Sequence, residues 1–140
     1  CFSALFCECV LSLLHDPLSA LKEFARVLNP GGFLILSDVY ARLPDEASAL
    51  QHLPLRCCIK GAVGRKQIMA MIEESSFTAV IWEDHSAFLK QLAAQLIFSF
   101  GSLNAFWAAA CSGEDPEAIE ETVQRARPGY YLLIARRKER

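Results

Sequence analysis

The stretch that decides the fold is residues 18–39, LSALKEFARVLNPGGFLILSDV. In residues 18–28, apolar side chains recur at spacings of three and four, which places them on one helical face and the charged residues on the other. The sequence Asn-Pro-Gly-Gly at 29–32 predicts a turn that ends the helix, because proline disfavours the α conformation before it and glycine tolerates positive φ. Residues 33–36 form a continuous apolar run, which predicts a parallel strand covered on both faces. Helix, turn and strand together predict an α/β sheet.

The flanking sequence continues this alternation. Residues 2–6 read as a buried strand entered in mid-domain, and we expect it to lie beside residues 33–36 and to run in the same direction. Residues 40–54 are expected to be loose, with a turn and short helix at 43–46. The other expected elements are a helix capped by Asp16-Pro17, helices over 65–75, 85–107 (interrupted at 99–102) and 115–127, and strands over 77–83 and 130–135.

Length and composition bound the class of protein. The chain has 140 residues, 53% of them hydrophobic and 21% charged, which predicts one globular domain over residues 1–140. A net charge of −2 gives no reason to expect a nucleic-acid partner. The sequence predicts no membrane span and no signal peptide, and six cysteines in such a chain are expected to be free thiols in a reducing, cytoplasmic setting.

A family resemblance rests on residues 20–39, ALKEFARVLNPGGFLILSDV. This run resembles the helix–strand segment of class I S-adenosylmethionine-dependent methyltransferases, whose common form is LxxxxRVLKPGGxLxxxD, with Asn29 in place of the lysine. The resemblance implies the C-terminal half of a Rossmann-like sheet. That sheet would be mixed, with an antiparallel last strand and a helical insertion before it.

The same resemblance implies that a glycine-rich cofactor loop is missing from this chain. The sequence Gly-Ala-Val-Gly at 61–64 neither follows a predicted strand nor resembles that loop. In this fold the loop and the helix N-terminus hold the polar end of the cofactor. We therefore expect S-adenosylmethionine to bind a longer parent protein, and to bind this chain alone weakly or not at all, leaving it inactive.

The loop after residues 2–6 is the first candidate site. By resemblance it lies beside the transferable methyl group, which makes Cys7 and Glu8 candidate cofactor contacts and Glu8 a candidate catalytic residue that orients the substrate or acts as a base. The alternative is that Glu8 is a partly exposed turn residue.

Two cysteines are candidate substrate ligands. The segments CECVLSLLHD at 7–16, SDVYA at 37–41 and CIKGA at 58–62 are similar to arsenite methyltransferases, in which two cysteines bind trivalent arsenic as thiolates. Residue by residue, these positions fall on Cys9 and Cys58, and Glu8 stands where that family has asparagine. Soft thiolates suit a thiophilic centre. The alternative is that the cysteines are buried structural thiols.

The remaining candidates are histidines and aromatic residues. The three histidines show no HxH or HExxH spacing, so no metal site is predicted. His85 ends a predicted strand at the ligand-binding edge and is a candidate substrate contact. The aromatic residues of the long helical region are expected to form core or a subunit interface rather than a substrate lid; they are Phe88, Phe98, Phe100, Phe106 and Trp107.

The sequence thus supports two functions. The first is the C-terminal part of a methyltransferase acting on a small-molecule or metalloid acceptor, by direct displacement at the methyl carbon. The second is a non-catalytic dimerisation or interaction module. An unpaired strand edge at residues 2–6 would invite association, so a homodimer or pairing with the missing N-terminal half is expected.

Overall fold

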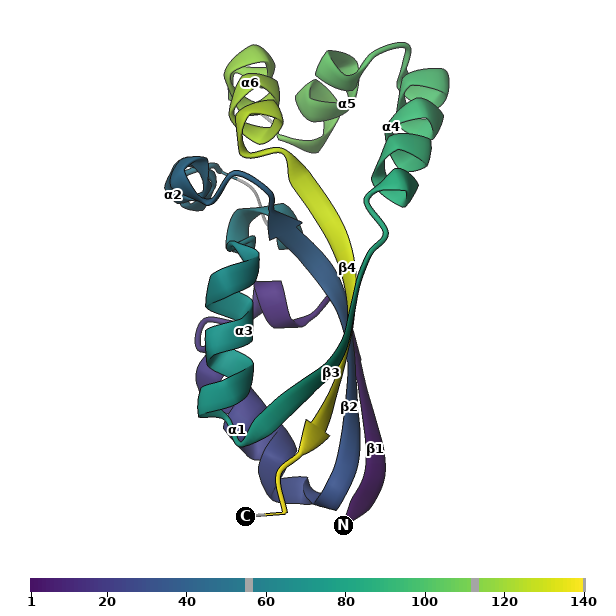
Figure 1. Cartoon of the computed structure of the whole chain (residues 1–140). Coiled ribbons are helices and arrows are strands. Elements are labelled where there is room, and N and C mark those ends of the chain that lie inside the picture. The colour runs from purple at the N-terminus through teal and green to yellow at the C-terminus, as the bar shows by residue number, and fades with distance from the viewer. Residues whose placement is uncertain (55–56, 112–113, 140) are drawn as a thin grey trace.

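The computed structural model describes residues 1–54, 57–111 and 114–139. Four strands form one sheet, two helices cover one of its faces, and the other helices lie beyond the strand ends (Figure 1). In chain order the elements are β1 (Phe2–Glu8), η1 (Leu11–Leu13), α1 (Pro17–Val27), β2 (Leu28–Ala41), η2 (Pro44–Glu46), α2 (Ala47–Gln51), η3 (Cys58–Gly61), α3 (Arg65–Glu74), β3 (Phe77–Asp84), α4 (Ala87–Phe100), α5 (Leu103–Ala110), α6 (Pro116–Ala126) and β4 (Pro128–Arg137).

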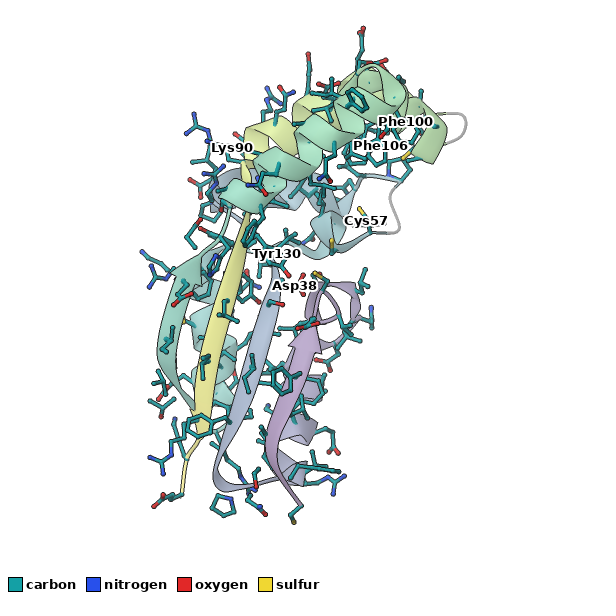
Figure 2. All side chains as sticks on the ribbon, turned by 90° about the vertical axis from the view of Figure 1, so that its right-hand side faces the viewer. Asp38, Cys57, Lys90, Phe100, Phe106 and Tyr130 are labelled. Carbon is teal, nitrogen blue, oxygen red and sulfur yellow. The ribbon has the colours of Figure 1, made fainter. Side chains whose placement is uncertain are left out.

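The sheet has the strand order β1-β2-β4-β3 (Figure 2). β1 pairs with β2 in parallel, and β4 is antiparallel to both of its neighbours. It follows that β1, β2 and β3 run in one direction, so their carboxyl ends meet at one edge of the sheet. This confirms the predicted parallel pair and the mixed α/β sheet with an antiparallel last strand.

Helices α1 and α3 form as predicted, with small differences at their ends. Asp16 caps α1, because its carboxylate accepts a hydrogen bond from the Ser19 N–H at 3.0 Å, and Pro17 occupies the first helical position. α1 buries Leu21 and α3 buries Ile72 against the same face of the sheet. Both helices therefore contribute to one core with the inner side chains of the strands.

The opposite face of the sheet is uncovered below the helical layer (Figures 1 and 2). Phe6 on β1 is 69% exposed and Phe33 on β2 is 42% exposed, whereas Leu34 and Leu36 are fully buried. The prediction that residues 33–36 are covered on both faces is therefore wrong. Side chains alternate between the faces of a strand, and α1 and α3 cover only one face.

β2 is longer than predicted. It pairs with β4 without interruption from Phe33 opposite Arg136 to Ala41 opposite Pro128, so the expectation that Tyr40 and Ala41 begin a loose segment is wrong. The register against β1 shifts from Phe2↔Leu28 to Ala4↔Phe33, so the predicted Asn-Pro-Gly-Gly turn is a bulge within β2. β2 is this long because β4, the last strand of the chain, pairs with it as far as Ala41.

Helices α4, α5 and α6 form the predicted insertion before the last strand, and they lie beyond the carboxyl edge (Figure 1). A second buried cluster joins α5 and α6 to α2, η3 and the end of β2; it includes Val39, Leu50, Trp107, Ile119 and Val123. Within the described chain, no single helix is long and apolar enough to span a membrane, and α4 with α5 meets that test only as a pair bent by 79°.

The aromatic residues of this insertion do not form one core. Trp107 is buried, but Phe98 is 93% exposed, and α4 has no buried residue at all. Phe106 contacts Phe100 and Trp107 edge-on or tilted. Hence only the aromatic residues of α5, Phe106 and Trp107, pack in the core. The subunit interface predicted for the other aromatic residues stays a prediction.

Candidate functional site

The candidate site lies where the carboxyl edge of the sheet meets the helical layer. Asp38 near the end of β2 and Tyr130 near the start of β4 lie at this junction, with Cys57 above them (Figure 2). Ligands of open α/β sheets bind at the carboxyl ends of the strands. The predicted site residues are therefore expected at this edge of the sheet.

Asp38 accepts hydrogen bonds from the loop that follows β1. Its carboxylate accepts hydrogen bonds from the Ser12 N–H at 2.8 Å, the Ser12 hydroxyl at 2.7 Å and the Val39 N–H at 2.8 Å. Burial raises the pKa of Asp38, while the hydrogen bonds from Ser12 and Val39 act in the opposite direction. Asp38 is 1% exposed, so its role here is to hold η1 rather than to contact a ligand. The sequence signal was an acid two positions after the apolar run of residues 33–36.

Gly61 brings η3 against η1. A Cβ atom at this position would lie 1.8 Å from the Ser12 carbonyl oxygen, so only glycine allows this approach. Because Asp38 holds Ser12 and Ser12 contacts Gly61, the loop after β1 and the segment carrying Cys58 are fixed relative to each other. No local sequence pattern marks Gly61, since the close approach joins segments far apart in the chain.

Cys9 directly follows β1 and has a left-handed backbone conformation, with φ of 51°. Its N–H donates to the Ser37 carbonyl at 2.8 Å, which continues the pairing with β2. Its thiol lies 3.4 Å from the Tyr130 hydroxyl, which donates to the Ser37 hydroxyl at 3.1 Å. Burial and the hydrogen bond with Cys9 raise the pKa of Tyr130. Sequence analysis did not identify Tyr130, because β4 reaches this edge only through the sheet topology.

Cys58 is half-buried at the start of η3. Burial, with contributions from the charges of Asp38, Cys57 and Cys9, raises its pKa to about 11. At pH 7 a thiol with that pKa is ionised in about one molecule in ten thousand. Cys58 is thus a neutral thiol near Cys9, and the role of these two cysteines as substrate ligands stays a prediction.

Cys7 and Glu8 point to opposite faces of β1, since side chains alternate along a strand. Cys7 is 5% exposed and belongs to the sheet core, where burial and the charge of Asp38 raise its pKa. Glu8 is exposed. The structure therefore does not bring these two side chains together, and their contact with a cofactor stays a prediction.

His85 lies at the carboxyl end of β3. Its Nε2 atom is 2.8 Å from the Glu83 carboxylate, and its ring stacks on Phe88 with centroids 5.5 Å apart. Its backbone N–H donates to the Tyr130 carbonyl at 2.7 Å. β4 and β2 separate β3 from β1, so His85 and Cys9 are not neighbours in the sheet.

A cavity of about 660 Å³ lies between η3 and the helices α4, α5 and α6. Its lining is mainly apolar, from Leu89, Leu92, Leu96, Phe106 and Trp107, and it includes both cysteines of the pair Cys57-Cys58. Cys58 therefore lines the cavity and also lies near Cys9 and Asp38 at the carboxyl edge of the sheet. Four separate segments build this cavity, so no local sequence pattern predicted it.

The described residues lack the loop that holds the polar end of S-adenosylmethionine in this fold. Glu8 is exposed beside Cys9 at the end of β1, but none of the described strands is followed by a glycine-rich loop. Within the described ranges, no group of three or more His, Cys, Asp or Glu side chains is arranged to hold a metal ion.

Two sequence comparisons match parts of this chain to methyltransferases. A family model described as a methyltransferase domain matches residues 1–36. Over 47 residues, 32% of this chain and 14% of the relative, the chain is 49% identical to the arsenite methyltransferase of Aquipseudomonas alcaligenes.

Solved structures match nearly the whole chain. The cyclase SpnF is similar over 98% of this chain and 50% of its own, with 26% identity and a TM-score of 0.60. A candidate sarcosine dimethylglycine methyltransferase from Galdieria sulphuraria is similar over 99% of this chain and 53% of its own, with 16% identity and a TM-score of 0.65. The chain spans about half the length of these two structures.

Proposed function

Since the chain belongs to the class I S-adenosylmethionine-dependent methyltransferase family, we propose that it forms the acceptor side of a methyl-transfer site. One observation carries this proposal: Cys58 lines the 660 Å³ cavity and also lies near Cys9 and Asp38 at the carboxyl edge. An acceptor bound in the cavity would thus reach the carboxyl edge of the sheet, where ligands of such sheets bind.

The bound cofactor would supply an electrophilic methyl group. The residues of this chain position the acceptor, since methyl transfer depends mainly on in-line geometry. η3 forms one wall, and η1 holds η3 in place through Asp38, Ser12 and Gly61. The helices α4 and α5 form the other wall and reduce contact with water.

The test is methyl transfer from radiolabelled S-adenosylmethionine by a full-length protein that contains this chain, against a panel of acceptors. Ala93 lines the cavity, whereas the next residue, Ala94, is exposed and does not. We expect Ala93→Phe to lower kcat/KM at least 10-fold and the matched control Ala94→Phe to leave it within about 2-fold, because only the first substitution fills the cavity. Equal effects of the two substitutions, or no transfer to any acceptor, would contradict the proposal.

A metalloid acceptor is favoured by the juxtaposition of Cys9 and Cys58. Trivalent arsenic would condense with both thiols, forming two As–S bonds, while the two thiol protons leave with oxygen as water. The raised pKa keeps Cys58 protonated at pH 7, so its proton must leave as the As–S bond forms.

Phenylarsine oxide tests this arrangement directly. We expect Cys9→Ser and Cys58→Ser each to weaken its binding at least 10-fold, because each removes one of the two bonds. Cys1→Ser is the matched control, since Cys1 is exposed at the start of β1. If Cys57→Ser weakens binding and Cys9→Ser does not, the arsenical bridges the neighbouring pair Cys57-Cys58 and the assignment of Cys9 fails.

An interaction module is the second candidate, and the uncovered sheet face supports it. Phe2 and Phe6 are 61% and 69% exposed on the edge strand β1. Apolar residues grouped on an exposed sheet face are typical of interaction surfaces. Light scattering of this chain should give a mass above that of the monomer, and Phe6→Ser should lower it; a monomer at all concentrations would count against association.

A further inference from the structure

We propose that the cavity between η3 and helices α4, α5 and α6 binds an apolar organic molecule that carries no negative charge. The binding itself follows from the walls of the cavity. That this molecule is the methyl acceptor rests on the proposed function.

The size and walls of the cavity suit a small organic ligand. Its volume of about 660 Å³ lies within the range of roughly 300–1,000 Å³ that is usual for such sites. Leu89, Leu92 and Leu96 present one apolar wall from α4, and Phe106 and Trp107 present another from α5. Sites of this kind combine apolar walls with a few polar groups that orient the ligand.

The protein itself does not cover the apolar side of α4. None of its residues is buried, and Leu92 is 48% exposed although it faces the cavity. A ligand between α4 and α5 would remove this apolar surface from water. The helix therefore lacks an apolar partner on the side that a ligand would occupy.

The charges around the cavity select against anions. Glu114 and Glu120 contribute carboxylates to the lining, and none of the described lining residues is a lysine or an arginine. Burial raises the pKa of Cys58 and of Cys111, so both thiols are neutral at pH 7. A carboxylate or phosphate on the ligand would be repelled by the carboxylates of Glu114 and Glu120, with no lysine or arginine among the described lining residues to pair with it.

Two dyes that share one apolar body test both parts of the proposal. N-phenyl-1-naphthylamine is neutral, whereas 8-anilino-1-naphthalenesulfonate carries the same ring system and one negative charge. We expect the neutral dye to bind at least 10-fold more tightly, and Glu120→Lys to reduce this ratio at least 3-fold. Equal affinities, or tighter binding of the sulfonate, would overturn the inference about charge.

The place of binding is tested with tryptophan fluorescence and matched substitutions. Trp107 lines the cavity and Trp82 lies in the sheet, so Trp107→Phe should abolish most energy transfer to the neutral dye and Trp82→Phe should not. Ala93→Phe should lower the affinity at least 10-fold, while Ala94→Phe should not change it. If Phe6→Ser on the uncovered sheet face abolishes binding instead, the dye binds there and the inference falls.

The two proposals fail separately. If the dye binds as expected but the full-length protein methylates only anionic or metalloid acceptors, the cavity binds an apolar molecule that is not the acceptor. If the protein transfers no methyl group at all, the proposed function fails, while the dye experiments still decide the nature of the cavity.

Discussion

Substituting Gly61 with alanine tests the contact that joins the two halves of the site. The new Cβ atom would lie 1.8 Å from the Ser12 carbonyl oxygen, and real Cβ atoms essentially never approach closer than 3.0 Å. The two backbones would have to separate by about 1.2 Å, the difference between these two distances. Forced displacements of this kind in a packed region cost roughly 1–3 kcal/mol.

The expected result of Gly61→Ala is a lower melting temperature and weaker arsenical binding. At roughly 4 °C for each kcal/mol in a chain of this size, the melting temperature should fall by about 4–12 °C in thermal denaturation followed by circular dichroism. Binding of phenylarsine oxide should weaken at the same time, because η1 leads on from Cys9 and η3 carries Cys58.

Lys60→Ala is the matched control for Gly61→Ala. Lys60 is exposed on the same η3 segment, so its loss should shift the melting temperature by no more than about 1–2 °C. If Gly61→Ala melts within 1 °C of the parent chain and binds the arsenical equally well, the inferred contact between η1 and η3 does not exist.

Four further predictions concern Asp38, Cys58 and the binding of the cofactor. Asp38→Asn should lower the free energy of unfolding by about 1–3 kcal/mol in urea titrations at pH 7, because a carboxamide cannot accept from all three of the donors on Ser12 and Val39; unchanged stability would contradict the described network. Burial raises the folded-state pKa of Asp38 above 3.8, so the stabilisation due to protonation of this carboxyl is complete below pH 3.8 and is lost as the pH rises through the folded-state pKa. Urea titrations at several pH values should therefore show the stability of the parent chain falling with pH relative to that of Asp38→Asn; a difference between the two that does not change with pH would contradict the raised pKa. Alkylation of Cys58 by iodoacetamide, followed by peptide mass spectrometry, should have its midpoint near pH 11 in the folded chain and near 9.0 in denaturant; equal midpoints would mean that burial does not raise the pKa of this thiol. Calorimetry of this chain with S-adenosylmethionine should detect no tight complex, since none of its described strands is followed by a glycine-rich loop; submicromolar affinity would contradict that account.

The amino-acid sequence alone determined most of the local structure. The Asp16-Pro17 start of α1, the spacing of its apolar residues and the apolar run of residues 33–36 each depend on neighbours a few positions away. The mixed sheet and its antiparallel final strand came from a family resemblance in one helix–strand segment. These features are accessible because capping, periodicity and turn chemistry act over short distances along the chain.

Only the tertiary structure decided which surfaces meet. It left Phe6 and Phe33 exposed, extended β2 to Ala41 through pairing with β4, and brought Tyr130 to Cys9. The cavity depends on four segments that are far apart in the sequence, and Gly61 matters only because Ser12 lies against it. Such contacts are set by the packing of whole elements against one another, which no short stretch of sequence encodes.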